Sequence, residues 1–159
     1  MSKLGLALSK VKVPDADHLM RWVRRNQQYR DSETDEFKGI LGIAFHIRSD
    51  DEGGLSTTWV EHYGPKSLLT YEIAASKFRD SLQSGKLGVQ SYFAIGNVGL
   101  TKAACLARYK KIRLVHAPDG PNTGHLEIHK FSDEDQELLE ILAVDVFTEH
   151  VSVISLGLK

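Results

Sequence analysis

The sequence contains little cysteine, little charge imbalance and no long apolar run. Its single cysteine, Cys105, excludes an internal disulfide framework and any site with several cysteine ligands. The net charge is -1 with the histidines counted as neutral, so no overall charge attracts the protein to nucleic acid or to anionic membranes. No stretch approaches the ~20 consecutive apolar residues of a membrane helix, and no signal-peptide pattern is evident. We therefore expect a soluble, cytoplasmic protein, because an unpaired thiol is typical of a reducing compartment.

The arrangement of predicted elements indicates the fold class. A chain of 159 residues can fold as one globular domain, residues 1–159, without disulfides or metals. Hydrophobic periodicity and capping residues predict strands at residues 4–13, 40–48, 89–98, 112–117, 125–131 and 151–156, and helices at residues 18–28, 57–63, 66–83, 100–109 and 132–149. Strands and helices do not alternate strictly, and residues 112–117 and 125–131 should form a hairpin. We expect the α+β class, with a mixed, mainly antiparallel sheet and helices packed on one face.

The stretch GPNTGHLEIHKF, residues 120–131, has polar side chains at every second position. His125, Glu127 and His129 alternate with Leu126 and Ile128, as in a strand with one face in the core. Such polar residues are ordinary on a solvated strand face. Two imidazoles and a carboxylate are also a possible ligand set for a metal ion. We expect no cofactor, and a divalent metal held by His125, Glu127 and His129 is the alternative.

The same strand can also be interpreted as catalytic. His125 would act as general acid or base, since imidazole titrates near neutrality. Glu127 would orient it, and His46 would complement it if their strands are neighbours. The candidates for holding a substrate phosphate are Arg48, Ser56 and Asn122.

The stretch DDEGGLSTTWVEHYG, residues 50–64, is the most distinctive part of the sequence. Its hydroxyl groups precede a predicted helix start, where backbone amides can hold an anion. It lacks the lysine and spacing of a P-loop and the Gly-x-Ser-x-Gly of a hydrolase elbow. A plain turn followed by a helix cap is the simpler interpretation.

Charge is separated along the second half of the chain. Five basic residues and no acids lie between positions 102 and 113, whereas seven acids and no bases lie between 133 and 149. The two segments either face each other within the fold or across a dimer, or each binds an outside partner. Nucleic acid is a less supported partner, because the basic segment has little aromatic interleaving. The predicted partner-binding residues are Lys102, Arg108, Lys110, Lys111 and Arg113.

Two functions from different classes are consistent with these patterns. The favoured one is a small interaction or accessory module of a larger bacterial-type assembly, which binds a protein partner or a second copy through the basic segment and the acidic last helix. The alternative is a histidine-based hydrolase or transferase that acts on a nucleotide or RNA phosphate, with or without a metal. Cys105 lies in an apolar helix segment, where we expect it to serve packing rather than catalysis.

Overall fold

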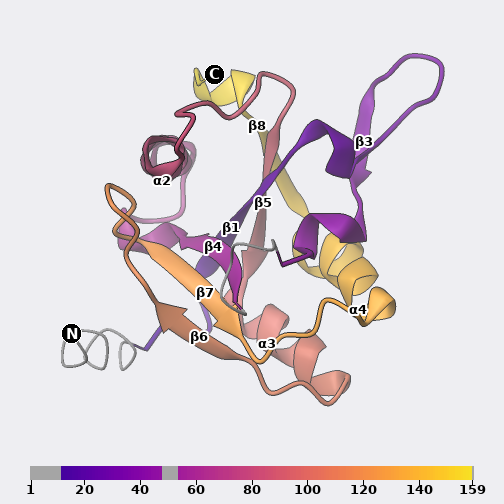
Figure 1. Cartoon of the computed structure of the whole chain (residues 1–159), viewed down its shortest axis with the longest axis vertical. Helices are drawn as coiled ribbons and strands as arrows, with labels where there is room; N and C mark the ends of the chain where they lie inside the picture. Colours follow the sequence, from indigo (N-terminus) through magenta and orange to yellow (C-terminus); the bar gives the residue numbers. More distant parts are fainter. Residues whose placement is uncertain (1–11, 48–53, 159) are drawn as a thin grey trace.

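Six antiparallel strands form the central sheet of the computed structural model, which describes residues 12–47 and 54–158 (Figure 1). The strand order across the sheet is β6-β7-β4-β1-β5-β8. The strands are β1 (His18–Val23), β4 (Leu55–Trp59), β5 (Tyr92–Asn97), β6 (Arg113–His116), β7 (His125–His129) and β8 (Glu149–Ser152). A separate hairpin joins β2 (Gln28–Arg30) to β3 (Phe37–Ile40).

Helices cover both faces of this sheet (Figure 1). They are α2 (Leu68–Ser81), α3 (Val98–Ala107) and α4 (Gln136–Ile141), the last continued by a π-helical segment, Leu142–Val146. Short 3-10 turns are η1 (Arg25–Gln27), η2 (Gly42–Phe45), η3 (Val60–His62) and η5 (Ile154–Leu156). None of the helices in the described ranges is long and apolar enough to cross a membrane.

The two faces bury separate hydrophobic cores, and β1 contributes to both. Leu19 and Val23 belong to the larger core with α3 and α4, whereas Met20 belongs to the second core with α2. This division follows from the alternation of side chains along a strand. The predicted α+β class with an antiparallel sheet is confirmed. The α3–α4 layer is the expected helical layer, and α2 adds a helix on the opposite face.

The second half of the chain follows the predicted order of elements. Helices form within residues 66–83 and 132–149, and strands form within 89–98, 112–117 and 125–131, including the predicted hairpin. The helix predicted at residues 100–109 forms as α3, which begins two residues earlier, at Val98. The side chain of Ser67 caps α2 by accepting a hydrogen bond from the Thr70 amide. Asp135, rather than Ser132, caps α4, since it accepts from the Leu138 amide. The last strand, predicted at residues 151–156, is β8 and spans Glu149–Ser152 instead.

Three predictions in the first half are wrong. Residues 18–28 form β1 and a 3-10 turn rather than a helix, because both faces of β1 are buried and its sequence shows no alternation. The strand predicted at residues 40–48 is wrong over its described part, since β3 ends at Ile40 and η2 follows. The predicted helix at residues 57–63 is the end of β4 followed by η3. The predicted opening strand at residues 4–13 lies largely outside the described residues.

A close contact between Gly96 and Phe147 joins β5 to the segment after α4. A Cβ atom at position 96 would lie 2.7 Å from Cγ of Phe147. Phe147 is fully buried and packs on Phe45, with ring centroids 4.8 Å apart. The ring therefore has little room to move away from a larger residue.

We predict that Gly96→Ala lowers the free energy of unfolding by about 1–3 kcal/mol, the usual cost of overpacking a core. Urea denaturation followed by circular dichroism measures the change. Gly39→Ala in β3 is the matched control, because no atom lies within 4 Å of the added Cβ. Equal effects of the two substitutions would contradict the proposed packing constraint.

Candidate functional site

The pairing of β4 with β7 brings together residues that lie far apart in the sequence. Ser56 is opposite Glu127 and Thr58 is opposite His125. Directly paired residues of an antiparallel sheet lie on the same face, so all four side chains share one face. This is the face that α2 covers further along the sheet, because Thr58 is also opposite Met20 of the second core.

His125 makes two hydrogen bonds that together define its tautomer. Its Nδ1 lies 2.7 Å from the carbonyl oxygen of Ala117, which can only accept, so Nδ1 carries the hydrogen. Its Nε2 lies 2.7 Å from Oγ of Ser56. In the neutral ring Nε2 is the acceptor, and the Ser56 hydroxyl donates to it. A serine hydroxyl directed at an imidazole that a third group orients is the arrangement of a nucleophile and its general base.

Glu127 pairs with His129 and not with His125. Its Oε1 lies 2.8 Å from Nε2 of His129, and both side chains are partly exposed. The group that orients His125 is therefore the Ala117 carbonyl, whereas the sequence analysis assigned this role to Glu127. Within the described ranges, no three histidine, cysteine or acidic side chains converge in a way that could hold a metal ion. The geometry of this part of the chain gives no support to a shared site of His125, Glu127 and His129.

The other predicted site residues are more scattered. His46 is exposed, and it is the backbone oxygen of His46 that accepts a hydrogen bond from Arg21. Arg48 lies outside the described residues. Asn122 is buried, donates to Oγ1 of Thr58 over 3.0 Å and accepts from the Tyr63 hydroxyl over 2.6 Å. Its side chain thus joins the loop before β7 to β4.

Arg21 is a central residue that sequence reasoning missed. Its side chain is buried, with 7% of the residue exposed. Nε donates to the Ala44 carbonyl over 2.8 Å, Nη1 to the Ser56 carbonyl over 2.7 Å and Nη2 to the His46 carbonyl over 3.1 Å. The pairing of β1 with β4 covers Leu19 and Met20 only, so Arg21 joins the two strands beyond their last paired residues. The sequence predicted a helix at this position and therefore did not indicate that Arg21 joins two strands.

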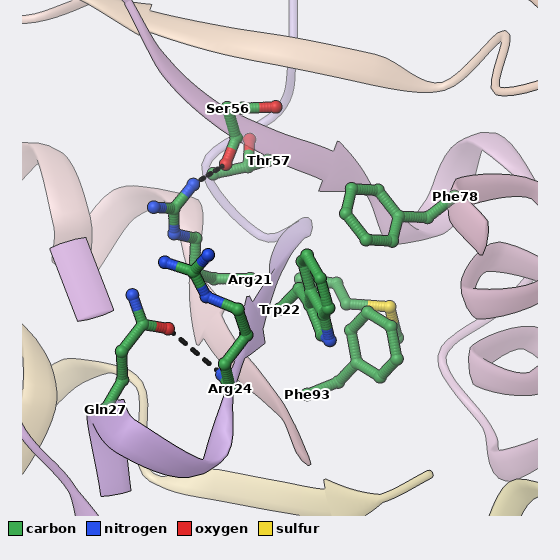
Figure 2. A pocket seen from close by; sticks show the side chains of 9 residues that line it. Arg21, Trp22, Arg24, Gln27, Ser56, Thr57, Phe78 and Phe93 are labelled. Carbon is green, nitrogen blue, oxygen red and sulfur yellow. Dashed lines mark hydrogen bonds between the residues drawn. The ribbon is translucent and has the colours of Figure 1, made fainter. Parts of the chain in front are cut away.

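A small cavity lies where β1 and β4 separate (Figure 2). Its volume is about 20 Å³, enough for roughly one water molecule. Ser56, Arg21 and Arg24 line its polar side, and Trp22 and Phe78 are among its aromatic residues. Ser56 therefore contacts His125 and also borders a space next to two guanidinium groups.

A second pair of histidines lies beside this site. Nε2 of His62 is 2.9 Å from Oγ1 of Thr123, and Nε2 of His116 is 2.7 Å from the Thr123 carbonyl oxygen. The centroids of the two imidazole rings are 5.6 Å apart. Burial, and then the neighbouring His116, lower the pKa of His62. Protonation of His62 is therefore less favourable in the folded protein than in the unfolded chain.

The thiol of Cys105 is a poor nucleophile. Cys105 is fully buried in the larger core, and burial raises its pKa to about 11. The group is therefore protonated at neutral pH, which agrees with the packing role expected from the sequence.

Part of the basic segment is neutralised within the fold. Nε of Arg108 lies 2.6 Å from a carboxylate oxygen of Asp135, and Nη1 lies 3.2 Å from one of Glu137. Lys102 lies 2.9 Å from Asp15. The basic segment and the start of the acidic helix thus meet inside one molecule, which was one of the alternatives left open by the sequence.

Comparisons with known proteins identify no relative. The chain matches no protein-family model, and neither a curated protein nor a solved structure matches it.

We predict that the melting temperature falls on acidification from about pH 7.5 to about pH 5.5, partly through His62. An unfolded histidine has a pKa of about 6.5. Because the pKa of His62 is lower in the folded state, its contribution to stability is present above that value and is lost as the pH falls through it. His62→Gln should reduce the slope of melting temperature against pH. An unchanged slope would contradict the account, and His46→Gln, at an exposed position, is the control.

Proposed function

We propose that the protein is a phosphoester hydrolase with Ser56 as the nucleophile and His125 as its general base. The observation that supports this proposal is the continuous chain of hydrogen bonds from Ser56 Oγ through both ring nitrogens of His125 to the Ala117 carbonyl, with both distances 2.7 Å. A neutral serine hydroxyl is a weak nucleophile, so it requires a base in direct contact. The sequence interpretation gave His125 this role but treated Ser56 only as a phosphate ligand.

Each reaction step can be assigned to an atom of this chain. Oγ of Ser56 attacks phosphorus while Nε2 of His125 takes the serine proton, and the ester P–O bond breaks on the opposite side of phosphorus, where the leaving oxygen takes a proton from water. The Ala117 carbonyl stabilises the imidazolium that forms in between, since it accepts from Nδ1. Water then attacks phosphorus from the opposite side and loses its proton to solvent, the P–Oγ bond breaks, and His125 returns its proton to Oγ, which restores Ser56 and the neutral imidazole.

Cations near Ser56 favour a phosphate over a neutral carboxylic ester. Arg24 lines the cavity that Ser56 borders, and Arg21, which donates to three backbone carbonyls, adds positive charge beside it. The Arg24 guanidinium lies over the ring of Trp22, 5.7 Å from its centroid, and no carboxylate among the described residues pairs with it. Guanidinium groups present paired donors that match phosphate oxygens.

The interaction module is the second candidate, and the surface of α3 favours it. Leu100 and Leu106 are 55% and 62% exposed, and Tyr109 just after the helix is 94% exposed. Leu106 and Tyr109 are followed in the sequence by Lys110 and Lys111, so the exposed apolar side chains at the end of α3 have basic neighbours. Such a surface suits an acidic amphipathic helix of a partner protein. Since Arg108 and Lys102 are paired internally, the basic segment offers fewer charges than its sequence suggests.

A fluorophosphonate probe tests the nucleophile without knowledge of the natural substrate, because Ser56 Oγ would displace fluoride from phosphorus. We predict a single adduct on Ser56, detected by intact mass and peptide mapping. Ser56→Ala should remove it, and His125→Gln should slow its formation by at least about 100-fold, the usual contribution of a general base.

His129→Gln is the matched control for this experiment, because His129 lies on the same strand face but contacts Glu127. It should label at the wild-type rate, and melting curves should show that each variant is folded. A wild-type protein that forms no adduct, or a His125→Gln variant that labels normally, would overturn the proposed function.

We predict that Leu106→Glu abolishes capture of any partner that binds α3, with little effect on melting temperature, since Leu106 is exposed. Pull-down with the wild type and the variant measures the difference. Val144→Glu changes an exposed apolar residue outside α3 and is the control. Equal capture by Leu106→Glu and the wild type would contradict the second candidate.

A further inference from the structure

A larger pocket lies on the outer side of the cavity that Ser56 borders. It has a volume of about 380 Å³, within the range of pockets that hold small organic ligands. Its wall is formed by the end of β1 and by the loop at residues 86–91. Trp22 and Arg24 line both this outer pocket and the inner cavity (Figure 2 shows them at the inner cavity). The two spaces are therefore neighbours through these two side chains.

The outer pocket is lined by cations and by no carboxylate. Its charged residues are Arg24, Arg25 and Lys86. Arg25 is paired with Asp35 at 2.8 Å, outside the pocket lining. Arg24 and Lys86 have no acidic partner among the described residues. Two cations without a counter-charge in one concave surface attract an anionic ligand.

Trp22 lines the same pocket, and its indole nitrogen has no hydrogen-bond partner in the described part of the chain. Its Nε1 is buried, and no acceptor lies within reach of it among the described residues. A buried donor without a partner is uncommon and costs free energy.

The loop that forms the other wall is held in place by the rest of the fold. Leu87 is buried in the second core, and its carbonyl accepts from the Ser91 hydroxyl over 2.6 Å. The Gln90 carbonyl accepts from Nε2 of Gln28 over 2.8 Å. Val89 is exposed at the pocket, where it offers an apolar surface. The wall exists before any ligand binds, which lowers the entropic cost of binding.

We infer that this outer pocket binds a phosphate ester of nucleotide size, with Arg24 and Lys86 on the phosphate and Val89 against the apolar part of the ligand. The inference rests on the proposed function only in placing this ligand next to Ser56 as its substrate. Binding itself requires neither Ser56 nor His125. Nucleotides are the members of this class that combine a phosphate with a planar group of suitable size.

Isothermal titration calorimetry with adenosine monophosphate and with adenosine tests the inference. We expect the monophosphate to bind at least about 10-fold more tightly than adenosine, and to bind more weakly as salt rises. Arg24→Gln and Lys86→Gln should each weaken binding by about 10-fold, whereas Lys111→Gln, an exposed lysine outside the pocket, should not. No binding of the monophosphate, equal affinity for adenosine, or unchanged affinity in the Arg24→Gln/Lys86→Gln double variant would overturn the inference.

The two proposals can fail separately. Ser56→Ala should bind the monophosphate with unchanged affinity, since the inferred phosphate ligands are Arg24 and Lys86. Binding without fluorophosphonate labelling would leave the pocket in place and remove the nucleophile. Labelling of Ser56 in a protein that binds no monophosphate would overturn the pocket and retain the nucleophile.

Discussion

The buried guanidinium of Arg21 is the interaction on which the rest of this structure depends. The ladder between β1 and β4 ends at Met20 and Thr58, and beyond that point Arg21 connects the strands through side-chain donors. Burying a charge is costly unless its donors are satisfied, and carbonyls of Ala44, Ser56 and His46 satisfy them. The separation of the strands creates the inner cavity, and the arginine keeps that separation in one geometry.

Ser56 is consequently held through its carbonyl oxygen and its hydroxyl group. Arg21 donates to its carbonyl oxygen and His125 accepts from its hydroxyl. The β6–β7 hairpin supplies the other side, because Ala117 and His125 come from its two arms and are joined by a backbone and a side-chain hydrogen bond. A nucleophile placed on paired strands is more rigid than one on a loop, as a preorganised site requires. In the proposed reaction, Arg24 beside the cavity would favour a substrate that carries a phosphate.

The sequence predicted the second half of the fold because local rules agree with the tertiary structure there. Leu126 and Ile128 alternate with polar residues since only one face of β7 is in the core, and α2 forms within the predicted residues 66–83, with Ser67 as its cap. The same rules failed at β1, where Leu19 and Met20 are buried on opposite faces. They failed again after β3, although residues 40–48 alternate. There Gly42 packs closely against Leu139, since a Cβ atom at position 42 would lie 3.1 Å from Cβ of Leu139. The chain turns into η2 at this point.

The sequence indicates the individual residues of the candidate site but not the contact between them. His125 and Ser56 stand out by type, yet their contact depends on β4 pairing with β7 across 69 positions. The group that orients His125 is a backbone carbonyl, which no residue pattern can indicate. The most direct test is the tautomer of His125, read from the nitrogen shifts of ¹⁵N-labelled protein at about pH 8, where an unperturbed imidazole is neutral. The account predicts a hydrogen on Nδ1 and a bare Nε2; a hydrogen on Nε2 would contradict it, because His125 would then be unable to accept the Ser56 proton.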